Sequence, residues 1–162
     1  HALNLWIDKK IIQQKNRKYT LAKKRLFLEG KNAEENRNIL QEYRKTAKRK
    51  GAILLSVFRG RNAEGTNFPD DYGKAIFLVG VPYADYSDPV VQAQINYFNN
   101  KTKGLGQEWY TMDAFRTANQ ALGRGIRHKD DSCKYFLMDT RYNYNIRMIA
   151  HWITSNNLSI KK

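Results

Sequence analysis

The sequence predicts an α/β domain built on a parallel sheet that is flanked by helices. Two continuous apolar runs of strand length, 52–58 and 75–79, carry this prediction, because strands covered on both faces lose the polar alternation of a half-exposed sheet. Helical segments separate these runs from shorter ones at 26–28 and 135–138. Such alternation of strands and helices is typical of parallel sheets.

Local signals place the helices of the N-terminal half. A basic helix is expected over residues 2–18. Asn32 is predicted to cap a second helix that runs to Lys50, because acidic residues occupy its first turn and basic residues its last, as the helix dipole favours. Gly51 is the expected stop.

In the C-terminal half, helices are expected over 90–100 and 108–123. A closing helix is expected to hold Ile146, Ile149, Trp152 and Ile153. The helix over 108–123 has one apolar stripe that is predicted to face the core, formed by Met112, Phe115, Ala118 and Leu122. A second stripe lies about 100° around the same axis and consists of Arg116, Gln120, Arg124 and Arg127.

The charge of the chain limits its partners. The 162 residues include 29 Lys and Arg against 15 Asp and Glu, a net charge of +14, which indicates a polyanion and most often nucleic acid. One cysteine and three histidines give no metal-ligand spacing, and no apolar run reaches the roughly 20 residues of a membrane span. We therefore expect an intracellular protein, nuclear if eukaryotic, with no metal site in this chain and no membrane partner.

The loop after the first long apolar run has the residue types of a phosphate-binding segment. It reads FRGRNAEGTNFP over residues 58–69 and lies beyond the carboxyl end of a predicted strand, where parallel sheets bind ligands. Gly60 and Gly65 permit close backbone approach, and Glu64 and Asn67 can hydrogen-bond a ligand. A plain polar surface loop would account for the same composition.

The end of the 108–123 helix allows a similar interpretation. It continues as NQALGRGIRH over residues 119–128. Arg and Gln suit planar contacts to phosphate oxygens, whereas a solvated helix face commonly mixes Lys with Glu. Gly123 and Gly125 are expected to keep side-chain bulk away from an approaching phosphate. A solvated basic face is the other interpretation.

Taken in this order and in this fold, the two segments resemble the C-terminal motor domain of the XPD/FANCJ family of superfamily 2 DNA helicases, the iron-sulfur branch. The loop matches the form R-G-x-x-x-E-G-x-[DN]-F at Arg59, Gly60, Glu64, Gly65, Asn67 and Phe68. The helix end matches Q-x-x-G-R-x-x-R at Gln120, Gly123, Arg124 and Arg127. The lead-in GQEWY at 106–110 is similar to the FANCJ and RTEL side of the family, and the resemblance covers about residues 26–153.

The resemblance implies a RecA-like domain of the P-loop NTPase type, the second of two domains that close on ATP. It implies that the catalytic residues facing the γ-phosphate are Gln120, Arg124 and Arg127, because an arginine from the opposing domain can stabilise the transition state. It implies nucleotide contacts by Glu64, Gly65, Asn67 and Gly123. Asn67 replaces the Asp of most of the family, so it can hydrogen-bond a ribose but carries no charge.

The resemblance also implies 5′ to 3′ movement on single-stranded DNA in repair and genome maintenance. The basic residues expected to contact DNA are Arg59, Arg61, Lys101 and Lys103. Aromatic residues in the same region could stack on bases, although residues of this kind more often pack in the core. These residues are Tyr83, Tyr86, Tyr97, Trp109 and Tyr110.

Several parts of the family's machinery are absent from this sequence. It has no G-x-x-x-x-G-K-[ST] Walker A loop, no Asp-Glu-x-His box and no set of four cysteines for an iron-sulfur cluster. The resemblance implies that an N-terminal domain of the same protein holds these parts, binds most of the ATP and Mg²⁺, and is the partner of this domain. Residues 1–162 are then expected to be one domain that lacks its first strand, and to hydrolyse no ATP alone.

Two other classes of function compete with this interpretation. A non-catalytic nucleic-acid-binding module would keep the fold with idle arginines, and it predicts DNA binding as well. A metabolic α/β enzyme is disfavoured, because no His, Cys or carboxylate pair forms a catalytic set.

Overall fold

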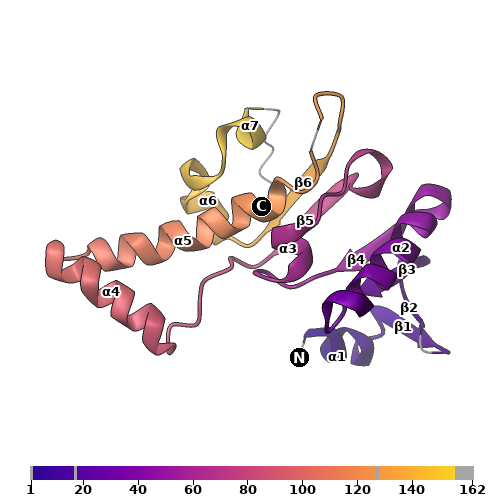
Figure 1. Ribbon diagram of the computed structural model, residues 1–162, viewed down its shortest axis with the longest axis horizontal. Coiled ribbons are helices and arrows are strands. Elements are labelled where there is room, and N and C mark those ends of the chain that lie inside the picture. The colour runs from indigo at the N-terminus through magenta and orange to yellow at the C-terminus, as the bar shows by residue number, and fades with distance from the viewer. Residues whose placement is uncertain (1, 17, 127, 156–162) are drawn as a thin grey trace.

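Two pairs of parallel strands form the centre of the computed structural model, which describes residues 2–16, 18–126 and 128–155 (Figure 1). The pairs are β3 (Lys24–Leu28) with β4 (Ala52–Leu55), and β5 (Ala75–Val79) with β6 (Lys134–Met138). Helices connect the two strands of each pair, which confirms the predicted α/β class. Among the described residues, the pairs belong to separate sheets rather than to one continuous sheet.

The N-terminal half combines a four-stranded sheet with one long helix. Strands β1 (Ile12–Lys15) and β2 (Lys18–Leu21) extend the sheet from β3 in antiparallel order. Helix α2 (Ala33–Lys50) crosses from β3 to β4. Its cap is the predicted one, since Asn32 Oδ1 accepts a hydrogen bond from the Glu35 amide at 2.8 Å. Gly51, with φ of 70°, ends the helix.

The helix expected over residues 2–18 is wrong beyond Asp8. Helix α1 (Ala2–Asp8) ends there, Lys10 has a left-handed φ of 57°, and the chain continues as the β1–β2 hairpin. Ile12 is buried, whereas the other residues of β1 are exposed. The two consecutive β-branched isoleucines, Ile11 and Ile12, favour this extended conformation over a helix.

The C-terminal half crosses from β5 to β6 through two helices that form a hairpin extending to one side of the molecule (Figure 1). These are α4 (Pro89–Lys101) and α5 (Leu105–Leu122), close to the expected ranges. Asp88 caps α4, because its Oδ1 accepts from the Val90 amide at 2.7 Å. Proline at the first position of α4 leaves no unpaired amide there.

The single closing helix expected near residues 146–153 is wrong. Its place is taken by short turns, and Asn119 of α5 contacts the backbone between them. Asn119 Nδ2 donates to the Met148 carbonyl at 2.8 Å and its Oδ1 accepts from the Ala150 amide at 2.9 Å, so a side chain binds backbone groups that a continuous helix would pair internally. The short elements of the chain are α3 (Arg61–Gly65), η1 (Asp70–Tyr72), α6 (Arg141–Tyr144), η2 (Ile146–Met148) and α7 (His151–Thr154).

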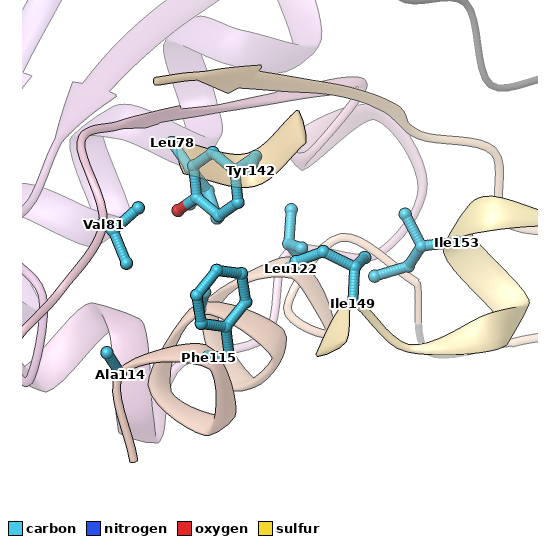
Figure 2. Packing of buried hydrophobic residues seen from close by; sticks show 9 residues of the cluster. Leu78, Val81, Ala114, Phe115, Leu122, Tyr142, Ile149 and Ile153 are labelled. Atoms are coloured by element: carbon cyan, nitrogen blue, oxygen red, sulfur yellow. The ribbon is translucent and has the colours of Figure 1, made fainter. Parts of the chain in front are cut away.

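The main core lies between α5, the β5–β6 pair and the C-terminal turns (Figure 2). Phe115 and Tyr142 are among its largest buried side chains, and their rings meet edge to face at 5.6 Å. Tyr142 also donates its hydroxyl hydrogen to the Gly80 carbonyl at 2.9 Å. Burial raises the pKa of this hydroxyl to about 12, so Tyr142 stays protonated as a donor at physiological pH.

The prediction that the apolar stripe of α5 is buried is confirmed except at Met112, its first residue. Phe115, Ala118 and Leu122 are at most 1% exposed, whereas Met112 is 62% exposed. Ala114 is fully buried in its place. The helix therefore turns a face centred nearer Ala114 and Ala118 toward the sheet, and small side chains there allow close packing.

The expectation that the strands are covered on both faces is wrong for β5 and β6. One face packs on α5, but burial alternates along both strands, and four apolar side chains on the other face are 42–57% exposed: Phe77, Val79, Phe136 and Met138. The rings of Phe77 and Phe136 stack on this face with centroids 4.4 Å apart.

We expect the two faces of α5 to respond differently to truncation. Phe115→Ala removes a buried ring and should lower the free energy of unfolding by about 3–5 kcal/mol. Met112→Ala on the exposed face is the matched control and should stay within about 0.5 kcal/mol. Denaturant unfolding of the two variants, followed by circular dichroism, measures both. Equal destabilisation would contradict the helix orientation described above.

Candidate functional site

The two predicted motifs meet through the backbone and side chain of Arg124. Arg124 follows the end of α5, and its Nε donates to the Ala63 carbonyl at 2.9 Å. Its Nη1 donates to Asn67 Oδ1 at 3.4 Å, and its backbone carbonyl accepts from the Phe68 amide at 2.9 Å. Two segments about 60 residues apart in sequence are thereby held side by side.

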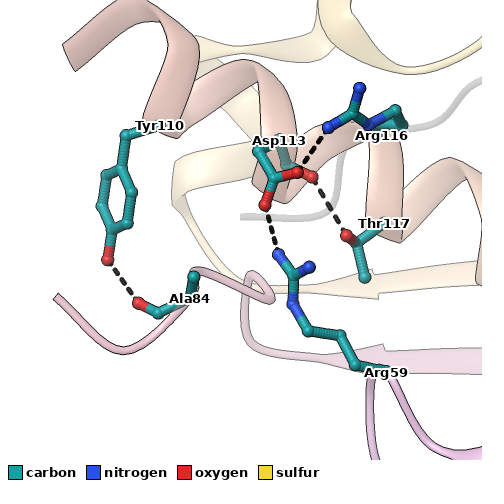
Figure 3. A network of polar contacts seen from close by, with 6 residues as sticks. All are labelled: Arg59, Ala84, Tyr110, Asp113, Arg116 and Thr117. Carbon is teal, nitrogen blue, oxygen red and sulfur yellow. Dashed lines mark hydrogen bonds and ion pairs between the residues drawn. The ribbon is translucent and has the colours of Figure 1, made fainter. Parts of the chain in front are cut away.

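Arg59 lies on the same loop but points to the middle of α5, where it pairs with Asp113 (Figure 3). Asp113 also pairs with Arg116 at 2.5 Å, and its side chain is only 13% exposed. Arg59 has a left-handed φ of 62°, a conformation that is uncommon for residues other than glycine. The ion pair with Asp113 therefore fixes the guanidinium of Arg59, and the left-handed conformation already constrains the backbone of this residue.

Opposing effects set the pKa of the Asp113 carboxyl. Burial by itself would raise it, but hydrogen bonds from Arg116 and Arg59, together with the charges of both groups, hold it below its ordinary value. Asp113 is therefore a carboxylate at physiological pH and balances one of the two arginines.

The residues expected to contact nucleotide lie around this junction with different exposure. Gly65 ends α3, and open space surrounds the position of a Cβ there, whereas Asn67 is half-buried against Arg124. Gly123 ends α5 and donates its amide to the Asn119 carbonyl. Glu64 lies in α3. Its side chain and all of Arg127 fall outside the described residues.

Gln120 is exposed one turn before Arg124. It lines a shallow groove of about 470 Å³ along α5, together with Met112, Arg116, Asn119 and Met148. The amide therefore stands on a surface that another molecule could reach.

Gly125 has a different role from the one expected. It is buried, and a Cβ added to it would lie 2.6 Å from Cys133 Sγ and 2.9 Å from Ile76 Cδ1. The residue therefore permits the chain after α5 to pack on the start of the β5–β6 pair, rather than clearing space for a phosphate.

Burial raises the pKa of the Cys133 thiol, which keeps that thiol neutral.

The four basic residues expected to contact DNA are not brought to one place. Arg59 and Arg61 belong to the loop after β4 and to α3, whereas Lys101 and Lys103 lie at the turn between α4 and α5, at the left edge of the molecule in Figure 1. The 18 residues of α5 separate that turn from Arg124 by about 27 Å. Arg61, Lys101 and Lys103 are exposed.

Most of the aromatic residues near this turn pack against one another. Tyr110 is buried beside Tyr83, and its hydroxyl donates to the Ala84 carbonyl at 2.6 Å (Figure 3). Trp109 stacks on Phe98 with centroids 5.7 Å apart. Tyr86 and Tyr97 remain more than half exposed, and Lys101 lies over the Tyr97 ring at 4.4 Å. The packing interpretation therefore holds for Tyr110 and Trp109, and Tyr97 is available to a ligand.

Within the described part of the chain, no three or more His, Cys, Asp or Glu side chains form a group that could hold a metal ion. None of the helices there is long and apolar enough to cross a membrane.

Two acidic residues of this region, Asp113 and Glu29, were not among the predicted site residues. Asp113 is 54 residues from its partner Arg59, and Glu29 is 28 residues from Val57, whose amide it binds. The only local signal is the spacing of Asp113 three residues before Arg116, which suits an ion pair on one helix face.

Comparison with known proteins supports the resemblance to a helicase motor domain that the two motifs indicate. The profile of the family described as "Helicase C-terminal domain" matches residues 5–156. The "Regulator of telomere elongation helicase 1 homolog" of Drosophila willistoni is 38% identical over 82% of this chain, and the "ATP-dependent DNA helicase chl1" of Schizosaccharomyces pombe is 37% identical over 83%. The chain spans 14% and 17% of the length of these two relatives.

The resemblance drawn from the motifs is confirmed by these matches. The two motifs lie together in the structure, on the loop after β4 with α3 and at the end of α5, and the profile covers nearly the whole chain. The chain therefore belongs to the helicase C-terminal domain family, among the XPD/FANCJ-like DNA helicases.

Proposed function

We propose that this chain is the second RecA-like motor domain of an ATP-dependent DNA helicase, and that it supplies arginines to ATP held by an N-terminal domain of the same protein. The observation that supports this most directly is the junction at Arg124, where the two motifs of the family contact each other through three hydrogen bonds. The relative from Schizosaccharomyces pombe is named as an ATP-dependent DNA helicase.

The contacts of Arg124 suggest how the two arginines divide their work. Arg124 is half-buried and donates to both the Ala63 carbonyl and Asn67, so it fixes the end of α5 on the loop. We assign it the role of an anchoring residue for the catalytic surface. Arg127, three residues further along the chain, is then the arginine proposed to stabilise the transferred phosphoryl group, and Gln120 is proposed as a second contact to that phosphate.

The nucleotide is expected to lie near α3 and the end of α5. Gly65 offers an open backbone position, and Asn67 can share its amide between Arg124 and a ribose hydroxyl. Glu64 and Gly123 are the other residues proposed to contact the nucleotide. ATP and Mg²⁺ are bound mainly by the other domain, because this chain has no Walker A loop. Its single cysteine is also too few for the four that hold an iron-sulfur cluster. An iron-sulfur cluster would belong to that domain as well.

Single-stranded DNA is the proposed track, with 5′ to 3′ movement in DNA repair and genome maintenance, inside the cell and in the nucleus if the organism is eukaryotic. The net charge of +14 suits a phosphate backbone. Arg59, Arg61, Lys101 and Lys103 are the proposed contacts, and the exposed Tyr97 ring could stack on a base beside Lys101.

The roles of the arginines predict graded losses of DNA-stimulated ATP hydrolysis in the full-length helicase. Arg124→Ala and Arg124→Lys should both lower kcat about 10- to 100-fold, because each loses charged hydrogen bonds that only the guanidinium can make. Arg127→Ala should lower kcat by about 10³-fold or more. Steady-state ATPase assays with saturating single-stranded DNA measure these losses.

Arg116→Ala is the matched control on the same helix, since the Arg116 side chain is 65% exposed and Asp113 keeps its other partner, Arg59. It should retain kcat within about twofold. Unchanged hydrolysis in both Arg124→Ala and Arg127→Ala would contradict the motor role and favour a non-catalytic nucleic-acid-binding module.

The proposed DNA-binding lysines predict a change in salt dependence. Replacing Lys101 or Lys103 by Ala in the full-length protein should reduce the slope of log affinity against log salt by about 0.7 for each phosphate that the lysine neutralises. Fluorescence anisotropy with a labelled oligothymidylate across a salt series measures the slope. Lys74→Ala, at an exposed lysine that pairs with Asp71, is the control and should leave it unchanged. An unaltered slope in the Lys101 and Lys103 variants would remove these residues from the DNA surface.

A further inference from the structure

The loop that carries Arg59 is folded around a carboxylate from another strand. Glu29 follows β3 directly, and its amide donates to the Leu55 carbonyl at 3.0 Å, which extends the β3–β4 pairing by one residue. Its Oε2 accepts from the Val57 amide at 3.1 Å and its Oε1 accepts from the Asn62 amide at 3.3 Å. One carboxylate therefore bonds both sides of the turn that contains Arg59.

Gly60 lies against this carboxylate. A Cβ at Gly60 would stand 2.7 Å from each carboxylate oxygen of Glu29 and 2.9 Å from Val57 Cγ2. The Gly60 amide donates to the Val57 carbonyl at 3.1 Å, which closes the turn. The glycine of the R-G motif is thus required here for the close approach of Glu29, and Arg59 takes the left-handed conformation at the tip of the turn.

A buried pair of amides supports the same turn from the side of α2. Asn36 Oδ1 accepts from the Gly30 amide at 3.1 Å, and Asn36 Nδ2 donates to Asn62 Oδ1 at 2.9 Å. Asn62 Nδ2 in turn donates to Ser56 Oγ at 3.0 Å. Asn36 and Asn62 are at most 5% exposed, so these hydrogen bonds replace solvent and fix the start of α3 relative to β3.

We propose that Glu29 is a positioning residue for Arg59. Glu29 sets the backbone of the turn, and Asp113 pairs with the guanidinium of Arg59. Arg59 is thereby presented in one orientation to the DNA phosphate that it is proposed to bind. This inference rests on the proposed function, because it acts through the DNA contact of Arg59.

The two acceptor oxygens are what the turn requires. Gln has nearly the same shape as Glu, but it offers one acceptor and places an NH₂ group against the second backbone amide. Glu29→Gln therefore tests the acceptor chemistry with little change in packing. Glu42→Gln is the matched control, since Glu42 is an exposed carboxylate on α2 that pairs with Arg25 away from the turn.

The experiment measures DNA-stimulated ATPase of the full-length helicase as a function of single-stranded DNA concentration. Glu29→Gln should raise the DNA concentration for half-maximal stimulation about tenfold and leave the KM for ATP unchanged. On an Arg59→Ala background, Glu29→Gln should add no further change, because its effect passes through that side chain. Glu42→Gln should match the wild type.

Wild-type DNA dependence of Glu29→Gln would overturn the inference, and so would effects of Glu29→Gln and Arg59→Ala that multiply. If the glutamine variant unfolds below the assay temperature, Gly60→Ala tests the same turn by crowding the carboxylate, and wild-type DNA dependence there overturns the inference. An Arg59→Ala variant with normal DNA dependence would instead contradict the proposed DNA contact of Arg59 itself.

Discussion

The site depends on contacts that join two halves of the domain whose strands do not pair with each other. β4 and β5 belong to separate sheets, so the segment between them and the end of α5 make the connection. Arg124 contributes through its side chain and its backbone carbonyl. Tyr43 of α2 adds a second link, because its hydroxyl donates to the Tyr72 carbonyl at 2.6 Å and its ring meets Phe68 edge to face. The motif residues therefore connect the two halves of the domain, in addition to being candidates for contacts with nucleotide or DNA.

Three acidic residues of this basic chain fix other parts of the structure in place. Asp113 pairs with Arg59 of the loop and with Arg116 of α5, Glu29 bonds two amides of the loop, and Glu35 closes the start of α2 by accepting from the Lys31 amide at 2.8 Å. Each carboxylate pairs with groups that would otherwise repel one another or remain without a partner. The excess positive charge is then left on the surface, where a polyanion can reach it.

Local sequence patterns predicted the elements whose signals are local. The strand over 75–79 and the helix between Asn32 and Gly51 are as expected, because the extended conformation of an apolar run and the capping of a helix are decided within a few residues. The hairpin after Asp8 is favoured by the β-branched Ile11 and Ile12, which helical periodicity does not report, whereas the break in the closing region near Met148 depends on the distant side chain of Asn119. Met112 fits the apolar stripe by spacing, yet helix orientation is decided by what packs on the opposite side.

The motifs identified the loop and the helix end as one site, but not how the site is held. A motif records which residues recur at fixed spacing, whereas the partners of Arg59 and Gly60 come from other parts of the chain. Gly125 shows the same limit, since its neighbour Cys133 belongs to the approach to β6.

The open face of β5 and β6 has a practical consequence for handling the domain. Stacked phenyl rings beside Val79 and Met138 form a contiguous apolar surface, and water gains freedom when such a surface is covered. A solution of this domain by itself would lower its free energy by bringing two such faces together. We therefore expect self-association when the domain is purified at high protein concentration. A polar substitution at Phe77 or Phe136 should suppress it.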